Sequence, residues 1–395
     1  MSPAMQLFPF CLVLFLLQGL AAVPWLMALS QRPFRQQLPF LLKVVGGVTA
    51  GGLLFAGILQ ANSDPVIVTL WGRFFASVFC FQLAIDLFVL AFYLLLNYWP
   101  KTGAVALAAF QEGVRQPMFW FLTVIGCLIM IVSIVIPYFT FGEDTKMVKE
   151  LTFALTMMIP AVFGVLSASI SVSEEIEGRT AVTLLSKPIK RRDFLFGKFI
   201  GITLAGMLMT TFMGWVLVWV VLAKFNYDLM PGITQIPPDP GWLTALIAKT
   251  FGSNLSGDLL RGIGLWISDN GEALPGLVIG FGQVMTLIAI SVALATRMPM
   301  VVNVSLCLVV YFLGHLTPIM TEVSNNPLIR FFAQLFALLL PGLDYFDVGP
   351  AIVREVPLDP ERYTIYTMNV GLYALMYTAI AILVGLILFE DRDVA

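Results

Sequence analysis

The sequence predicts an all-α, polytopic helical membrane protein with about nine transmembrane helices. Hydrophobic residues make up 59% of the 395 residues and charged residues only 12%, whereas an average soluble domain has about 25% charged residues. The apolar residues form runs of about 20, the length that crosses a hydrocarbon core of roughly 30 Å. The net charge is −2, and no basic patch interleaves aromatic residues, so nucleic acid is not an expected partner.

Three spans are expected in residues 1–100, which we assign to an N-terminal accessory module. The first is expected to be retained, because the chain start carries no positive charge and the arginines follow the apolar run. Asp86 lies near the middle of the third span, where a carboxylate is costly and by default indicates function. A protonated or hydrogen-bonded interior residue near Gln82 is an equally weighted alternative. The expected spans are residues 5–29, 41–59 and 74–96.

Residues 101–395 are expected to form a core of six spans. The core begins with an amphipathic helix on the membrane surface at residues 101–116, which carries Glu112 and Arg115 beside apolar positions and ends before Pro117. The six expected spans are residues 118–138, 151–172, 199–223, 273–296, 300–320 and 368–389.

Shorter segments lie between these spans. Residues 328–340 are too few to cross the membrane and predict a re-entrant or interfacial helix. Residues 242–249 and 259–267 predict short interfacial helices, because tryptophan favours the headgroup level. Pro160 predicts a kink in the second span of the core.

The stretch 171–198 is crowded with charged residues and lies between two apolar runs. Burying a charge at the bilayer centre costs about 2.5–3.5 kcal/mol, so this stretch is expected to stay in water between two spans. Its basic residues place it on the cytoplasmic side. We expect a plasma (inner) membrane protein, and the density of basic residues predicts that its N-terminus lies outside and its C-terminus in the cytoplasm.

Local patterns subdivide this charged stretch. Ser171 and Glu174 form a capping-box pattern, and Asp193 is placed to cap the next span. Residues 179–186 predict a short amphipathic helix that ends at Pro188, because proline lacks an N–H group. Such a helix on the cytoplasmic surface is suited to docking, but composition alone gives an ordinary positive-inside loop about the same weight.

The sequence E-E-I-E-G-R-T, followed by L-L-S-K-P-I-K-R-R-D-F-L-F-G-K, resembles the coupling segment of type-2 ABC exporter permeases. The branch it resembles most serves the maturation of multicopper enzymes. The resemblance covers residues 101–395, places the coupling segment at 173–198 and leaves residues 1–100 without a counterpart. The residues to which it assigns coupling to an ATPase are Glu174, Glu175, Glu177, Gly178, Arg179, Thr180, Leu184, Leu185, Pro188, Arg191 and Arg192.

The resemblance also implies partners. We expect a permease subunit of an exporter, with a separate cytoplasmic ABC ATPase in two copies that binds ATP and Mg²⁺. A second permease copy would complete a homo- or heterodimer in the lipid bilayer. The chain has no G-x-x-x-x-G-K-[ST] motif, no catalytic motif and no expected cofactor of its own, so we do not expect an enzyme.

No metal site is expected either. His315 is the single histidine, the four cysteines are scattered, and the methionines are more typical of core packing than of copper ligation. Two alternative functions stay open. One is an ATPase-coupled assembly or maturation subunit that moves no solute and shares every motif, and the other is an intramembrane transferase acting on lipid-linked substrates.

Overall fold

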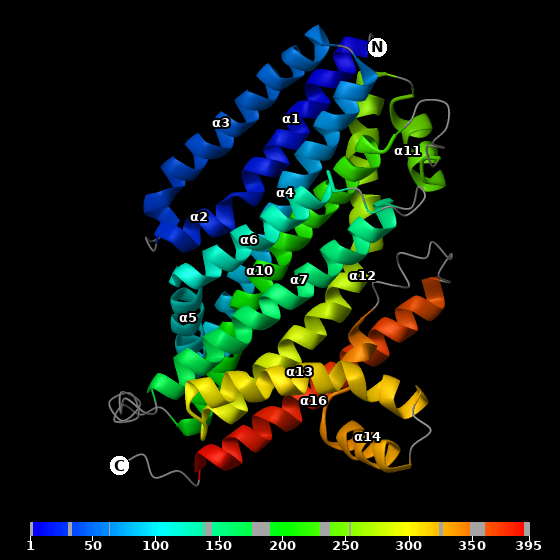
Figure 1. The fold of residues 1–395 in the computed structure, drawn as a ribbon. Coiled ribbons are helices and arrows are strands. Elements are labelled where there is room, and N and C mark those ends of the chain that lie inside the picture. Colours follow the sequence, from blue (N-terminus) through cyan, green and yellow to red (C-terminus); the bar gives the residue numbers. More distant parts are fainter. Residues whose placement is uncertain are drawn as a thin grey trace. The chain divides into compact units, whose positions relative to one another are not determined.

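The computed structural model describes residues 3–30, 34–62, 64–136, 138, 144–175, 190–229, 238–252, 254–323, 327–347 and 360–390. Within these ranges all regular structure is helical, and no strand occurs (Figure 1). By length and composition, eight of the described helices can cross a membrane, or nine if one bent pair of helices counts as a single span. The predicted all-α, polytopic membrane fold is therefore confirmed.

The chain divides into two compact units. The first contains Met1–Tyr93 and Met230–Glu272, and the second contains Leu94–Leu229 and Ala273–Ala395. Two long helices, α4 (Pro65–Tyr98) and α12 (Leu255–Ala295), contribute residues to both units. The assignment of residues 1–100 as an accessory module stays a prediction.

The first unit is held together by close helix packing. At Gly72 of α4 and Gly262 of α12 the two helices approach so closely that a Cβ atom on either residue would strike the backbone of the other helix. Arg73 next to this contact forms an ion pair with Asp269 of α12, with Nη1 and Oδ2 2.5 Å apart. The other helices of this unit are α1 (Pro3–Ala21), α2 (Val23–Ser30), α3 (Phe34–Ala61) and α11 (Gly241–Thr250).

The second unit has a buried centre and a more exposed periphery. In the most apolar part of each helix, the share of residues that are buried is 67% for α7 and α12, 50% for α10 and 22% for α13. Exposed apolar side chains on α13 and α16 suit contact with lipid. The helices of this unit, besides the end of α12, are α5 (Pro100–Arg115), α6 (Pro117–Ser133), α7 (Asp144–Ala168), the π-helix η1 (Ser169–Glu174), α10 (Arg191–Tyr227), α13 (Met300–Val323), α14 (Pro327–Leu339), the 3₁₀ helix η2 (Leu343–Phe346) and α16 (Pro360–Glu390).

Three predicted short helices can be compared with this structure. The amphipathic helix expected at residues 101–116 is α5, which joins α6 at a bend of 57°. The short helices expected at residues 328–340 and 242–249 are α14 and α11. Pro160 lies inside α7, which runs through it as one helix, and a kink there stays a prediction.

The separate helix expected at residues 259–267 is wrong. These residues belong to α12, a continuous helix of 41 residues, which at 1.5 Å per residue extends about 60 Å. Charged residues in this part of α12 have partners, because Asp269 binds Arg73 and Arg261 binds Asp239 through two hydrogen bonds of 2.6 and 3.0 Å. A charged side chain with a partner does not need to end a helix.

Both capping predictions are also wrong. Helix α7 continues without a break into η1, so Ser171 lies within a helical turn and its side chain binds Lys198 instead of capping a helix. Helix α10 begins at Arg191 with Lys190 as its N-cap residue, so Asp193 is the third residue of its first turn.

Candidate functional site

A buried lysine lies where the charged stretch rejoins the helices of the second unit. Lys198 on α10 is only 5% exposed. Its Nζ is 2.6 Å from Glu175 Oε1, 2.7 Å from Ser171 Oγ and 3.3 Å from Glu112 Oε2. The Ser171 hydroxyl also donates to Glu112 Oε2 over 3.3 Å. One ammonium group therefore joins three elements of the unit, and we call these four residues the Lys198 cluster.

Small residues bring Glu112 to this lysine. The face of α5 that is buried consists of Gly103, Ala106, Ala109 and Gly113, spaced three or four residues apart. On α10, a Cβ atom at Gly201 would lie 2.7 Å from the Ala109 Cβ atom. Small residues at this spacing let helices in membranes approach closely. The packing of α5 on α10 thus places Glu112, about one helical turn after Ala109, within reach of Lys198.

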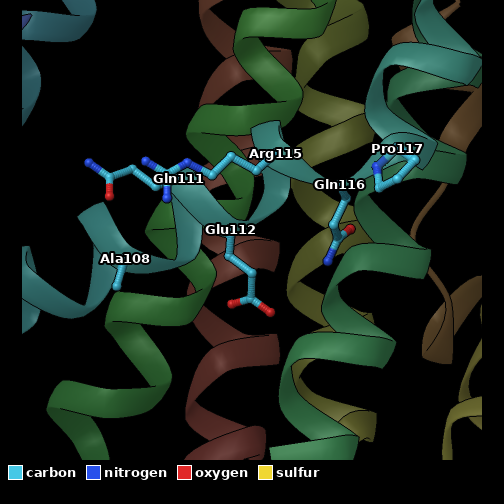
Figure 2. Close-up of a pocket in the computed structure, with 6 residues that line it drawn as sticks. All are labelled: Ala108, Gln111, Glu112, Arg115, Gln116 and Pro117. Carbon is cyan, nitrogen blue, oxygen red and sulfur yellow. The ribbon is translucent and has the colours of Figure 1, made fainter.

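The Glu112 side chain is accessible from outside the helix bundle, although Lys198 is not. A hollow of about 540 Å³ lies along the bend between α5 and α6 and is lined by Ala108, Gln111, Glu112, Arg115, Gln116 and Pro117. Figure 2 shows Glu112 and Gln116 pointing to the same side of this bend, while Arg115 extends along α5 toward Gln111. The Glu112 side chain is 43% exposed and the Lys198 side chain 6%.

A second contact attaches the charged stretch to the last helix. Arg191 Nη1 donates to the carbonyl oxygens of Phe389 at 2.8 Å and Glu390 at 2.9 Å, and its guanidinium carbon lies 5.5 Å from the centre of the Phe389 ring. Arg297 Nε donates to Leu388 O at 2.7 Å. The last carbonyl groups of a helix lack partners within it and favour nearby cations. These two arginines therefore stabilise the end of α16 beside the point where α10 begins.

Most of the residues predicted to couple to an ATPase lie outside the described residues: Glu177, Gly178, Arg179, Thr180, Leu184, Leu185 and Pro188. Of the others, Glu174 is the last residue of η1. Arg192 has an exposed side chain, and its Nε lies 4.0 Å from Asp193 Oδ1. Glu175 and Arg191 make the contacts given above. The assignment of all these residues to coupling stays a prediction.

Sequence reasoning did not select Lys198 as a site residue. A usable signal was present, since Lys198 falls on the same face of α10 as the buried residues Leu195, Ile202 and Ala205. A lysine on an apolar helix face inside a membrane protein generally pairs with an acidic residue or with backbone carbonyl groups. The sequence alone does not say which of the many distant carboxylates that partner is.

Asp86 lies on α4 in the first unit. Its Oδ1 atom is buried and has no hydrogen-bond partner among the described residues. Gln82, one turn before it, is instead paired with Gln18 of α1, and its Nε2 donates to Gln18 O at 3.3 Å. A role for Asp86 therefore stays a prediction.

The described residues include no group of three or more His, Cys, Asp or Glu side chains that could hold a metal ion. His315 Nδ1 lies 2.9 Å from Tyr311 O, and its Nε2 lies 3.4 Å from Gln283 Nε2. The histidine is thus engaged in local hydrogen bonding within the second unit.

The long apolar helices and the charges gathered at their ends define a multi-pass helical membrane protein. A family model described as "ABC-2 family transporter protein" matches residues 104–394. The chain therefore belongs to this family of ABC transporter permeases, which are membrane transport subunits and not catalytic ones. Membership implies association with an ABC ATPase subunit. Comparison with curated proteins gives no match.

Proposed function

We propose that this chain is the permease of an ATP-driven exporter and that its charged stretch, residues 171–198, receives the ATPase on the cytoplasmic side of the plasma membrane. One observation carries the proposal: Lys198, at the end of the stretch, binds Ser171 and Glu175 at its beginning. Glu175 and Lys198 are 23 residues apart in sequence, yet their charged atoms are 2.6 Å apart. Because Lys198 joins the beginning and the end of this segment, a force that the ATPase applies to the segment would reach both η1, which continues α7, and α10.

The docking surface in this proposal is residues 179–188. Leu184 and Leu185 fill an apolar groove of the ATPase, and Glu174 and Glu177 pair with its basic residues. ATP and Mg²⁺ bind to two ATPase subunits. When they bind ATP, the two ATPase subunits move toward each other and tilt the core helices of two permease copies. Family membership of residues 104–394 supports this division of labour between the subunits. In this proposal the substrate path lies between α7 and α13.

The proposal is tested at the two leucines. A double variant, Leu184→Asp with Leu185→Asp, places two charges in the apolar contact, where an unpaired buried charge is costly. We expect at least a tenfold loss of the ATPase that co-purifies with the tagged permease from detergent. The control variant, Leu184→Met with Leu185→Met, keeps apolar side chains of similar volume and is expected to retain the ATPase. Unchanged co-purification with the aspartate variant would contradict docking through this segment.

A further inference from the structure

A π-helix connects α7 to the charged stretch. Helix α7 ends at Ala168, and η1 continues it as six π-helical residues, Ser169–Glu174. π-Helical turns are rare and occur frequently at functional sites, and their hydrogen bonds join residue i to i+5 instead of i+4. Tightening this turn to an α-helix shifts the residues that follow by about one position. One position is about 100° of rotation and 1.5 Å of translation along a helix.

The start of η1 is fixed by buried hydrogen bonds. Ser169 Oγ donates to Val165 O at 2.7 Å and accepts a hydrogen bond of 2.9 Å from Asn303 Nδ2 on α13. The same Asn303 amide donates to Ser291 O and Ser291 Oγ on α12 at 3.0 and 3.1 Å. A change of register in η1 therefore begins after Ser169 and moves the residues that lead into the charged stretch.

Three consecutive residues of η1 face three different neighbours. Ser171 binds Lys198 of α10, and Val172 is 0% exposed in an apolar cluster with Phe194 and Phe389. Ser173 Oγ donates to Met298 O at 3.0 Å, between α12 and α13. Rotation by about 100° would exchange these positions, so that Val172 leaves its apolar cluster and both Ser171 and Glu175 leave Lys198.

The second carboxylate of the Lys198 cluster, Glu112, can keep the ammonium group paired during such a rotation. Leaving a buried ammonium without an acidic partner is strongly destabilising. Glu112 belongs to α5 and not to η1, so its position does not depend on the register of η1. Its ion pair with Lys198, which is 3.3 Å long in this structure, would therefore survive a movement of Glu175 away from the lysine.

From these contacts we propose that Lys198 is a positioning residue that exchanges carboxylates during the transport cycle. It holds Glu175 and Ser171 while residues 169–174 are π-helical, and it keeps only Glu112 once the ATPase has drawn this turn into an α-helix. The inference rests on the proposed function, because the ATPase supplies the pull on η1. Lys198 thereby sets which register of the turn is stable, with the acidic residues of two elements competing for it.

The test follows the chemical reactivity of position 172 in the complex of permease and ATPase, because the positions of Ser171, Val172 and Ser173 are all buried and the rotation changes their neighbours. In a variant without the four native cysteines, Val172→Cys is alkylated by N-ethylmaleimide with and without a non-hydrolysable ATP analogue. We expect alkylation at least tenfold faster with the analogue, because residue 172 then takes the place of Ser171 beside Lys198, and a neighbouring ammonium group favours the reactive thiolate. Ala168→Cys, equally buried but in α7 before the turn, is the control and is expected to stay protected in both states. Equal rates at Val172 with and without the analogue, in a complex that retains its ATPase, would overturn the exchange and leave the docking proposal standing.

Two isosteric variants distinguish exchange from a merely structural ion pair. Glu175→Gln weakens the π-helical register alone, so Val172→Cys is expected to react fast even without nucleotide. Glu112→Gln leaves Lys198 dependent on Glu175, so Val172→Cys is expected to stay protected even with the ATP analogue. Opposite shifts support the exchange. Shifts of both variants in the same direction would contradict it, since the loss of either carboxylate would weaken a purely structural cluster in the same way.

Discussion

Helix α10 carries a buried lysine near each of its ends, and the two differ in where their partners come from. Lys198 binds Glu112 of α5 and Glu175 after η1. Lys224 is 2% exposed and binds Asp228, the residue that caps the end of its own helix, at 3.1 Å. It also binds Asp144 at the start of α7 at 3.8 Å and Ile134 O at 3.2 Å. The two lysines are 224 minus 198, or 26, residues apart, which is about 39 Å along the helix.

This difference separates an anchor from an adjustable contact. Asp228 is four residues from Lys224, and this spacing keeps the two side chains together for as long as α10 is helical. The rings of Tyr138 and Tyr227 also lie within 6.0 Å of the Lys224 ammonium group. The partners of Lys198 belong to other elements, one of them next to a π-helix. The Lys224 end of α10 is therefore suited to stay fixed while the Lys198 end changes partners.

The largest effect on stability is expected when both carboxylates of either lysine are removed. The double variants Glu112→Gln with Glu175→Gln, and Asp144→Asn with Asp228→Asn, each leave a buried ammonium without a carboxylate. Breaking a buried ion pair in this way costs about 3–5 kcal/mol. We expect both double variants to lower the apparent melting temperature of the purified permease by several degrees. A melting temperature equal to that of the wild type for either variant would contradict a stabilising role for that pair of carboxylates.

Removing the lysines themselves is expected to affect stability less and to separate the two ends by function. Each lysine variant leaves carboxylates that are partly exposed, 43% and 24% for Glu112 and Glu175 and 25% and 32% for Asp144 and Asp228. Water can solvate these carboxylates at a lower cost than a fully buried charge, so Lys198→Met and Lys224→Met are each expected to fold. With Lys198→Met, alkylation of Val172→Cys is expected to lose its dependence on ATP, whereas Lys224→Met is expected to keep the tenfold response. A full response in the Lys198 variant would remove the functional distinction between the two lysines.

Apolar periodicity predicts the class of fold and the approximate position of each span, because a run of about 20 apolar residues has few alternatives to crossing the bilayer. The amphipathic helix α5 is predictable for a different reason, because its charged residues lie beside apolar ones and Pro117 follows it. The Lys198 cluster is not, because Glu112 and Lys198 are 86 residues apart in sequence and no local pattern joins them. The π-helical register of Ser169–Glu174 is hidden likewise, since it depends on Asn303 and Lys198, which belong to other helices.

The smallest effect on stability is expected at Asp86, which has no described lysine partner and so lies outside the comparison of the two lysines. Asp86→Asn removes a charge that is costly inside a membrane and keeps the shape of the side chain, so expression is expected to stay at the wild-type level. If Asp86 serves transport, this variant abolishes the activity, measured as ATP hydrolysis by the reconstituted complex of permease and ATPase. Wild-type hydrolysis with asparagine at this position would make Asp86 a structural residue, and the ion pairs of α10 would then be the better place to look for charges that move during transport.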